Sequence, residues 1–306
     1  MKLKNKSIKI KKLNIKNISS IPKPSWIKTK AILNTKKIKY IKKLIKINNL
    51  NSVCEQASCP NLTECFNYGI TTFMILGSIC TRKCPFCNIK NGRPKNPDIN
   101  EPKKISYIIK KMKINHVVIT SVNRDDLHDR GAYQFYNCIK YIRINNPSVS
   151  IEILVPDFRK KIDYALKIIN MSPPDIFNHN LENVPRLYKI IRPGSNYKNS
   201  LKLLLKFKLY NPNIPTKSGL MLGLGEKKEE ILNVMNDLRC QGVTMLTLGQ
   251  YMQPTKNHLP VKRYISPKEF IYIKNKAKKM GFINVASGPF VRSSYHADLQ
   301  LKGIEF

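Results

Sequence analysis

The sequence predicts an α/β fold built on a parallel sheet, in the form of an incomplete β/α barrel. From residue 69 onward, short and wholly apolar segments alternate with helix-like segments, a pattern typical of parallel strands buried on both faces. Such repeated units form either a doubly wound sheet or a barrel. Most strand candidates end in polar groups, as in TSVNRDD and NHNLEN, which favours a barrel because a barrel carries its site at these ends. About six units are visible, and an open sheet is the alternative.

The expected elements are short and follow one another in a regular order. Strands are expected at 71–76, 116–121, 150–156, 175–180, 217–224 and 244–251. Helix-like segments lie between or after them, near 101–113, 132–144, 158–170, 198–208 and 227–240. A last helix near 267–280 precedes the short apolar run INVAS, and a helical candidate at 35–47 lies before the barrel.

The composition indicates a folded protein with a basic surface. Hydrophobic residues make up 42% of the 306 residues, which is enough for a full core. The formal net charge of +36 by itself suggests nucleic-acid binding. The lysines, however, are spread along the chain among Ile and Asn, and no nucleic-acid-binding signature accompanies them. We therefore expect no nucleic-acid partner, although a basic face that steers an acidic protein partner remains open.

The chain is expected to be cytoplasmic, with no membrane association. Its longest apolar run, ITTFMILGSIC, is too short to span a bilayer, and the basic N-terminus lacks the apolar stretch of a secretory signal. Thiols stay reduced in the cytoplasm. The eight cysteines therefore indicate metal binding or catalysis rather than disulfides.

Three cysteines, Cys80, Cys84 and Cys87, follow the first expected strand within eight residues. Thiolates at this density suit zinc or an iron–sulfur cluster. A structural zinc site needs four ligands, and no fourth Cys or His follows at zinc spacing. Three ligands on a cubane cluster leave one iron free for a substrate or cofactor. A zinc site that borrows a distant ligand is the alternative.

The segment CTRKCPFC resembles the C-x3-C-x2-C signature of the radical S-adenosylmethionine (SAM) enzymes, including the aromatic residue before the last cysteine. This resemblance implies a 4Fe–4S cluster whose open iron binds the amino and carboxylate groups of SAM. In those enzymes the reduced cluster passes one electron to the sulfonium, which yields methionine and a 5′-deoxyadenosyl radical. The resemblance also implies a partial (β/α)6 TIM-like barrel.

A second group, Cys54, Cys59 and Cys65, has the spacing C-x4-C-x5-C, which is unusual for zinc. It resembles the lipoyl synthase family, as do the segments PNLTECF, TSVNRDDL, FNHNLENVPRLY, IRPGSNY, TKSGLMLGLGE, GVTMLTLGQYMQP and GPFVRSSYHADL. Together they cover the chain from about residue 51 to the C-terminus. The resemblance implies that these cysteines hold an auxiliary 4Fe–4S cluster, the sulfur source, with Ser294 of the RSSY motif as its fourth ligand.

The resemblance assigns the three residues Asn123, Glu182 and Arg192 to the SAM pocket, with Glu182 bonding the ribose hydroxyls and Arg192 the carboxylate. Arg124 and Asp125 also follow the second expected strand and are equally well explained as polar groups of the barrel rim.

Three expected parts divide the chain: a basic leader over 1–24, which we expect to be mobile, an extension over 25–68 with the auxiliary ligands, and the barrel over 69–306. By the same resemblance, the C-terminal segment of the barrel closes on the auxiliary cluster.

Five other residues need comment. Cys138 and Cys240 are expected to be core thiols, because each lies in a helix-like segment among apolar neighbours. His179 and His258 are candidates for proton carriers, but a lone histidine more often has a structural role. Arg130 replaces a glycine of the family pattern, so a positive φ there would be strained.

The function implied by the resemblance is insertion of two sulfur atoms at C6 and C8 of an octanoyl chain, which is amide-linked to a lysine of a lipoyl-carrier domain. The implied partners are octanoylated E2 subunits of 2-oxoacid dehydrogenases and the glycine cleavage H protein, a ferredoxin or flavodoxin reductant, and an iron–sulfur carrier protein. Two alternatives are another radical SAM sulfur-inserting enzyme, such as a biotin-forming type, and a zinc-dependent nucleic-acid-binding protein.

Overall fold

A computed structural model of the chain describes residues 21–28, 35–68, 70–301 and 304. Most of the expected leader, residues 1–20, therefore lies outside the described residues.

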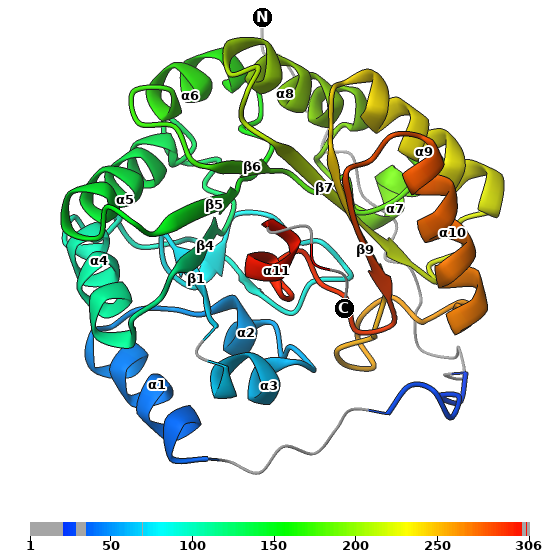
Figure 1. Ribbon diagram of the computed structural model, residues 1–306, viewed down its shortest axis with the longest axis horizontal. Coiled ribbons are helices and arrows are strands. Elements are labelled where there is room, and N and C mark those ends of the chain that lie inside the picture. The colour runs from blue at the N-terminus through cyan, green and yellow to red at the C-terminus, as the bar shows by residue number, and fades with distance from the viewer. Residues whose placement is uncertain (1–20, 29–34, 69, 302–303, 305–306) are drawn as a thin grey trace, which may run out of the picture.

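Seven parallel strands form the main sheet of the described residues, and their order in space is their order in the chain. A doubly wound sheet reverses its strand order at a switch point, whereas the order here never reverses in the described chain. The strands curve around a central axis, which confirms the incomplete barrel (Figure 1). They are β1 (Thr72–Ile75), β4 (His116–Ser121), β5 (Ser150–Leu154), β6 (Ile176–Asn178), β7 (Thr216–Leu222), β8 (Met245–Gln250) and β9 (Asn284–Gly288).

The six strands expected from the sequence are all present, and the apolar run after the last helix adds the seventh, β9. The long helices lie outside the strands (Figure 1). They are α1 (Lys36–Ile47), α4 (Glu101–Met112), α5 (Ala132–Asn145), α6 (Ile162–Ile169), α8 (Tyr197–Tyr210), α9 (Lys228–Cys240) and α10 (Pro267–Lys279).

Local sequence explains both the ends and the buried faces of these helices. In α10, Ser266 accepts a hydrogen bond from the backbone N–H of Glu269, and Pro267 occupies the first turn, where its missing N–H costs nothing. In α4, the stripe of Ile105, Ile108 and Ile109 is buried at helical spacing. None of the described helices is long and apolar enough to cross a membrane.

The two cysteines expected in the core differ in exposure. Cys138 is fully buried in α5, as expected, but the expectation for Cys240 is wrong because its side chain is exposed. Cys240 is the last residue of α9, and it lies beyond the buried positions Ile231, Val234 and Leu238 of that helix.

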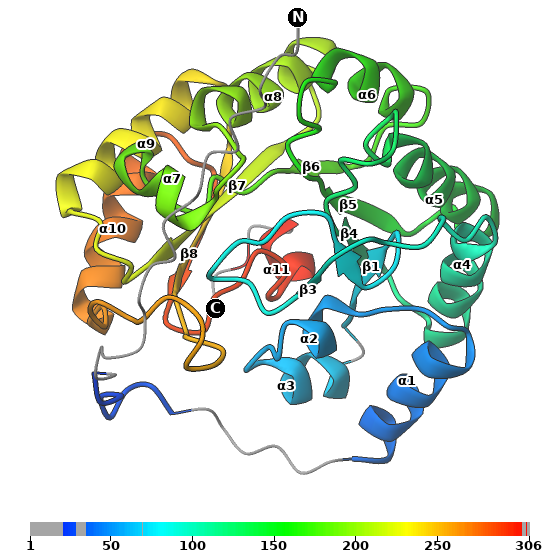
Figure 2. The ribbon, with the colours of Figure 1, turned by 180° about the vertical axis from the view of Figure 1, so that it is seen from behind.

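Several short elements complete the described fold, and the sequence did not predict them because they are too short to show a period. They are α2 (Val53–Gln56), α3 (Leu62–Asn67), β2 (Ile79–Cys80), β3 (Lys90–Asn91), the 3-10 turn Pro185–Leu187, α7 (Tyr188–Ile191) and α11 (Ala297–Leu301). Both ribbon views place α2 and α3 across the gap between β1 and β9, with α11 inside the curve of the sheet (Figures 1 and 2). The N-terminal helices α2 and α3 and the C-terminal helix α11 are therefore brought together.

Two glycines make room for close contacts inside the sheet, Gly249 for the C-terminal segment and Gly219 for the side chain of Asn180. A Cβ at Gly249 of β8 would overlap the carbonyl oxygen of Val291. A Cβ at Gly219 of β7 would lie 2.7 Å from Oδ1 of Asn180 and 2.6 Å from Oγ1 of Thr247. The absence of a side chain at Gly249 lets the returning chain approach β8 closely.

Candidate functional site

The loop with Cys80, Cys84 and Cys87 leaves the sheet after β1 and curls back on itself. The N–H of Cys87 donates to the carbonyl of Cys84 at 3.0 Å, and the N–H of Gly92 donates to the carbonyl of Cys80 at 2.9 Å. The N–H of Arg82 points at Sγ of Cys80 at 3.4 Å. These backbone contacts fold three thiols around one small volume.

The electrostatics of this loop show how close the thiols are to one another. Burial, together with the charges of Cys80 and Glu182, raises the pKa of Cys84 to about 11, although Arg192 opposes the rise. Burial and the neighbouring thiols also raise the pKa of Cys87 to about 12. A metal cluster bound here would have to replace protons on at least these two thiols.

Glu182 and Arg192 thus lie within electrostatic range of the cysteine loop, although more than 90 residues separate each of them from it in sequence. Nη1 of Arg192 donates to the carbonyl of Asn180 and to the hydroxyl of Tyr188, both at 2.9 Å. Glu182 has a positive φ of 69°, and its backbone bonds Gly219 and Met221 of β7. Burial raises the pKa of Glu182, while Arg192 and Asn180 lower it.

Asn123 lies against the same loop, directly after β4. Its carbonyl accepts hydrogen bonds from the N–H and the hydroxyl of Thr81 at 3.0 and 2.9 Å. Its Nδ2 lies 3.8 Å from Sγ of Cys80. Its Oδ1 is buried without a partner among the described residues, and a buried acceptor of this kind is normally satisfied by a ligand or a water. All three residues expected to contact SAM are therefore gathered beside the cysteine loop.

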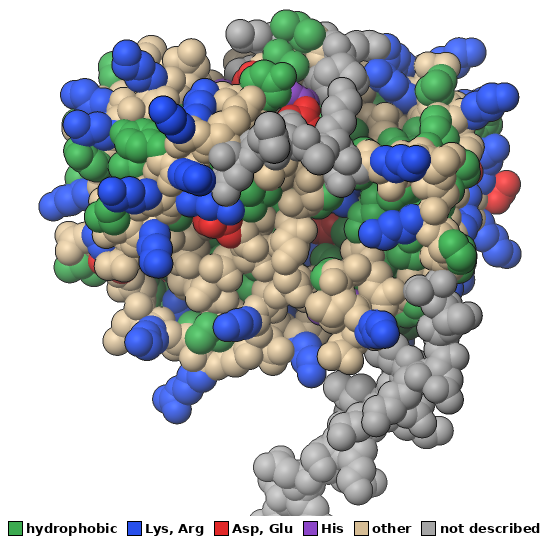
Figure 3. Space-filling view, turned by 90° about the horizontal axis from the view of Figure 1, so that it is seen from below, with side chains coloured by type: hydrophobic (Ala, Val, Ile, Leu, Met, Phe, Trp, Pro, Cys, Tyr) green, Lys and Arg blue, Asp and Glu red, His purple; other side chains and the backbone are tan. Residues whose placement is uncertain are grey.

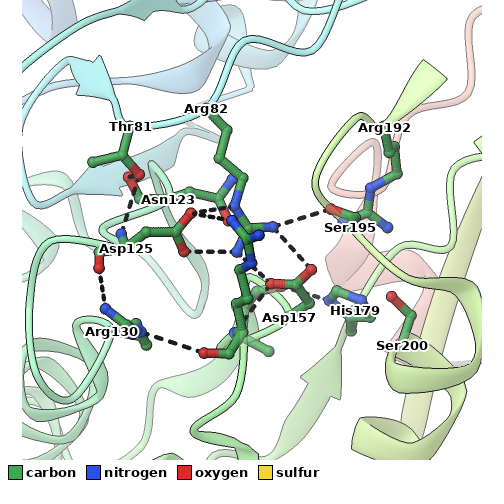
Figure 4. A network of polar contacts seen from close by, with 12 residues as sticks. Thr81, Arg82, Asn123, Asp125, Arg130, Asp157, His179, Arg192, Ser195 and Ser200 are labelled. Carbon is green, nitrogen blue, oxygen red and sulfur yellow. Dashed lines mark hydrogen bonds and ion pairs between the residues drawn. The ribbon is translucent and has the colours of Figure 1, made fainter. Parts of the chain in front are cut away.

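Arg82 ties the cysteine loop to three other parts of the barrel (Figure 4). It donates two hydrogen bonds to the carboxylate of Asp125, at 2.6 and 2.7 Å, and two to that of Asp157, at 2.7 and 2.9 Å. A fifth bond, at 3.0 Å, goes to the hydroxyl of Ser195. All five N–H donors of the guanidinium are thus used. The sequence reasoning missed this network, although Asp157, like Asp125, follows the end of a strand.

Arg124, the neighbour of Asp125, has a different role. Arg124 is 2% exposed, and its guanidinium bonds the carboxylate of Asp126 and the carbonyl of Leu76, which lies just after β1 and before the cysteines. Of the two rim candidates after β4, only Asp125 bonds a side chain that lies between Cys80 and Cys87, that of Arg82.

Arg130 adopts the positive φ that the sequence comparison with the family suggested, at 58°. Its guanidinium bonds the carbonyls of Asp125, Leu127 and Arg159, so the side chain holds the loop in which it lies (Figure 4). These bonds compensate for an unfavourable backbone conformation.

The second cysteine group lines a separate small pocket. Cys54, Cys59 and Cys65 all face it, together with Ser294 and Arg292 from the C-terminal segment. The structure therefore brings together all four residues that the resemblance assigned to an auxiliary cluster, although more than 200 residues separate Ser294 from the cysteines.

Short helices position these thiols. The hydroxyl of Ser52 caps α2 by accepting from the N–H of Cys54 at 3.1 Å, and α3 carries Cys65. Burial and the charge of Cys59 raise the pKa of Cys54 to about 11. Burial also raises the pKa of Cys65, and Cys54 and Cys59 add to the rise. Burial also raises the pKa of Cys59, and the nearby charge of Arg292 opposes part of this rise.

The N-terminal extension holds the C-terminal segment on both sides of Ser294. Nδ2 of Asn61 donates to the carbonyl of Phe290 at 2.6 Å, and the hydroxyl of Tyr295 donates to Glu64 at 3.0 Å. Asn61 is the residue before α3, and Glu64 lies within α3, the helix that carries Cys65. The same helix thus contributes a thiol and fixes the segment that contributes the hydroxyl.

Neither cysteine group suits one metal ion. Within the described ranges, no three His, Cys, Asp or Glu side chains are arranged so that they could hold a single ion. A polynuclear cluster does not need its ligands to converge on one ion, because each ligand binds a different iron atom. The chemistry of the donors, thiolates with one hydroxyl, fits iron–sulfur clusters at both places.

The two candidate histidines are held by structural hydrogen bonds. Nδ1 of His179 bonds the carbonyl of Val155 at 2.8 Å, and burial followed by the charge of Arg192 lowers the pKa of His179 to about 4. Nε2 of His258 donates to the carbonyl of Cys87 at 3.2 Å, and its Nδ1 bonds Thr255 at 2.8 Å. His258 therefore fixes the loop after β8 onto the cysteine loop.

Comparison with known proteins agrees with this geometry. A family model described as the Radical SAM superfamily matches residues 74–238. A lipoyl synthase from Photorhabdus laumondii is 60% identical over 298 residues, which cover 97% of this chain and 93% of the relative. A lipoyl synthase from Baumannia cicadellinicola is 61% identical over 291 residues, which cover 95% of this chain and 99% of the relative.

The chain belongs to the lipoyl synthase family. The family expected from the sequence is thereby confirmed, and with it an enzyme of the radical SAM superfamily. Membership in this family implies SAM and 4Fe–4S clusters as the cofactors, as predicted.

Two solved structures show the same fold at low sequence identity. The FeFe-hydrogenase maturase HydG from Carboxydothermus hydrogenoformans has a TM-score of 0.58 at 14% identity and covers 76% of this chain and 56% of its own. Streptococcus suis SuiB bound to S-adenosylmethionine has a TM-score of 0.54 at 12% identity, with 81% and 60% covered. At this identity the likeness concerns the fold alone.

Proposed function

We propose that this chain inserts two sulfur atoms, at C6 and C8, into an octanoyl group attached to a lysine of a lipoyl-carrier domain. The observation that supports this best is the presence of two separate thiol groups, one beside the charged side chains of Glu182 and Arg192 and one in a pocket with a hydroxyl. When bound, the clusters and SAM supply the radical and the sulfur atoms.

The first thiol group, Cys80, Cys84 and Cys87, is proposed to hold the cluster that binds SAM. Arg192 and Glu182 supply opposite charges near it, which suits a ligand with both an ammonium and a carboxylate. In this proposal Arg192 donates to the SAM carboxylate and Glu182 accepts from the ribose hydroxyls.

Asn123 is the third proposed SAM contact. Its unpartnered Oδ1 accepts a hydrogen bond from the bound SAM in this proposal.

The second thiol group, Cys54, Cys59 and Cys65, is proposed to hold the auxiliary cluster together with Ser294. A hydroxyl oxygen is a poorer partner than a thiolate for a soft iron–sulfur site. A weak ligand suits a cluster that must open during the reaction. The guanidinium of the half-buried Arg292 offsets part of the negative charge that three thiolates bring.

The reaction is tested by incubating anaerobically purified protein with SAM, a reductant and an octanoylated carrier domain. The expected carrier product has gained two sulfur atoms, as the dithiol under the reductant and, after oxidation, as the disulfide with two hydrogens fewer. The Cys54/Cys59/Cys65→Ala triple is the matched control, and it is expected to cleave SAM without adding sulfur. An unmodified carrier, alongside rapid SAM cleavage by the unchanged protein, would instead favour a different sulfur-inserting reaction.

The proposed carriers are the E2 subunits of 2-oxoacid dehydrogenases and the glycine cleavage H protein. Basic side chains cover the face shown in Figure 3 without gathering into one stripe, and the net charge is +36. If this charge steers an acidic carrier, the association rate falls steeply as ionic strength rises. A flat response to salt would contradict the steering role but leave the reaction untouched.

The remaining partners follow from the chemistry of the proposed site. Reduction of the first cluster requires a low-potential donor, for which we propose a ferredoxin or flavodoxin, and replacement of a consumed cluster requires an iron–sulfur carrier protein. All eight cysteines are free thiols, which suits the reducing cytoplasm.

A further inference from the structure

Asn180 lies between the two thiol groups and contacts the surroundings of both. It follows β6 at the end where the proposed SAM residues gather. Both its backbone carbonyl and its side-chain amide are engaged in hydrogen bonds. No role was assigned to it by the sequence beyond its place at a strand end.

Toward the SAM pocket, Asn180 contacts two of the proposed SAM residues. Its carbonyl accepts a hydrogen bond from Nη1 of Arg192 at 2.9 Å. Its Nδ2 donates to Oε1 of Glu182 at 3.1 Å. Any ligand that engages Arg192 or Glu182 therefore competes with, or pulls on, bonds that fix Asn180.

Toward the auxiliary cavity, Asn180 contacts Ser293. The hydroxyl of Ser293 lies 2.7 Å from Nδ2 and 3.0 Å from Oδ1 of Asn180, so the amide holds this hydroxyl whichever way its proton points. Ser293 is the immediate neighbour of Ser294, whose side chain lines the auxiliary cavity. Gly219 leaves the space that the Asn180 amide occupies.

The other anchors of this segment belong to a different element. Phe290 and Tyr295 are bound by Asn61 and Glu64 of the α3 region, so they hold the segment to the thiols of the auxiliary group. The bond between Ser293 and Asn180 instead connects it to the SAM pocket. A displacement of Asn180 would therefore move Ser293 and Ser294 while the residues on both sides of them stay fixed.

We propose that the Asn180–Ser293 pair is a positioning device that couples occupation of the SAM pocket to the placement of Ser294 at the auxiliary cluster. This inference rests on the proposed function, because it needs a cluster at each site. Coupling between two sites is reciprocal. Loss of the auxiliary cluster must therefore change SAM affinity, by about 5-fold or more if the coupling is of ordinary size.

The test measures the SAM dissociation constant by equilibrium dialysis in four proteins. These are the unchanged chain and Ser293→Ala, each with its auxiliary thiols intact and each with the Cys54/Cys59/Cys65→Ala triple. We expect the triple to change the constant about 5-fold or more in the unchanged background, and by less than about 2-fold when Ser293 is alanine. Ser287→Ala is the matched control, because it also loses one hydroxyl bond, to the carbonyl of Phe270, and should retain the full coupling.

A spectroscopic measurement gives a second readout. The Mössbauer spectrum of the auxiliary cluster should change on addition of SAM in the unchanged chain and in Ser287→Ala, but not in Ser293→Ala. If Ser293→Ala fails to retain the auxiliary cluster, Asn180→Asp replaces it. That variant keeps the side-chain shape but loses the Nδ2 donor to both Glu182 and Ser293, and we expect it to lose the coupling as well.

The outcomes separate the two claims. The inference would be overturned if Ser293→Ala showed the same coupling as the unchanged chain while both clusters were present. Where Asn180→Asp takes the place of Ser293→Ala, the same comparison applies to it. An unchanged chain that binds iron at only one thiol group would overturn the proposed function instead.

Discussion

The guanidinium of Arg82 donates to both carboxylate oxygens of Asp157, at 2.7 and 2.9 Å, and both side chains are buried. Arg82 lies between Cys80 and Cys84, whereas Asp157 follows β5. The cysteine loop is therefore fixed to the barrel by a paired, charge-assisted contact rather than by apolar packing alone.

Arg82→Lys is expected to weaken SAM cleavage about 10²-fold while the protein still binds its full iron content. A lysine keeps the charge but cannot donate to Asp125 and Asp157 in the same planar geometry, and small displacements of reacting groups have effects of this size. The measurement is the rate of 5′-deoxyadenosine formation, with iron counted on the same sample. Arg124→Lys is the control, since Arg124 is as buried but bonds Asp126 and Leu76. An equal loss in both variants would show that the effect is not specific to the loop.

Asp157→Asn is expected to destabilise the protein by about 2 kcal/mol at pH 7, and by less as the pH falls. Burial favours the neutral acid, but the hydrogen bonds and charge of Arg82 outweigh it and hold the pKa of Asp157 at about 2. Because the folded-state pKa is below the unfolded value of about 3.9, the stabilisation is full above about pH 5 and is lost as the pH falls toward 2.

Urea unfolding at pH 7, 5, 4 and 3 checks this dependence. Asp126→Asn serves as the comparison: its carboxylate also pairs with an arginine but is 39% exposed, so a change of about 1 kcal/mol or less is expected. A difference between Asp157→Asn and the unchanged chain that stays constant down to pH 3 would contradict the assignment of the pKa shift to Arg82.

The sequence was sufficient to predict the barrel and both thiol groups, for physical reasons that can be named. Strands such as β4 and β8 are mostly apolar and buried almost throughout, because a parallel sheet is covered on both faces, and this pattern needs no knowledge of contacts. The spacing of Cys80, Cys84 and Cys87 is equally local. The complete set of four auxiliary residues could not be predicted from local spacing, since only a family resemblance connected Ser294 with Cys54.

The parts that the sequence did not predict depend on contacts between distant residues. Arg82 meets Asp157 and Ser195 across 75 and 113 residues, and nothing near any of them marks the pairing. The elements α2, α3 and α11 have four to six residues, too few to show a period. Cys240 was misjudged because one apolar residue at a helix end has the same neighbours whether it faces inward or outward.

Gly249→Ala is expected to remove the auxiliary cluster and leave the first cluster in place. A Cβ at Gly249 would overlap the carbonyl of Val291 and push the segment with Ser294 away from the thiols. Gly288 pairs with Gly249 in the sheet, but its added Cβ would meet only the side chain of Val291, at an ordinary 3.6 Å. Gly288→Ala should therefore retain both clusters. Iron and sulfide counts on the two variants distinguish them, and equal counts would contradict this role of Gly249.

Arg130→Gly is expected to be more stable than Arg130→Ala by about 1 kcal/mol. Both variants lose the side-chain bonds to Asp125 and Leu127, but only alanine retains the strain of a φ of 58°. Thermal unfolding of the two variants measures the difference. Equal stability would mean that this backbone conformation is not adopted in solution.

The central claim is that two thiol groups hold two separate clusters, and iron counting on two triple variants tests it most directly. The unchanged chain should bind about eight irons after anaerobic reconstitution, as expected for two cubanes. The Cys80/Cys84/Cys87→Ala and Cys54/Cys59/Cys65→Ala triples should each bind about four, with Mössbauer spectra that add up to the spectrum of the unchanged chain. A single cluster in the unchanged chain, or a triple that loses all of its iron while remaining folded, would contradict the account.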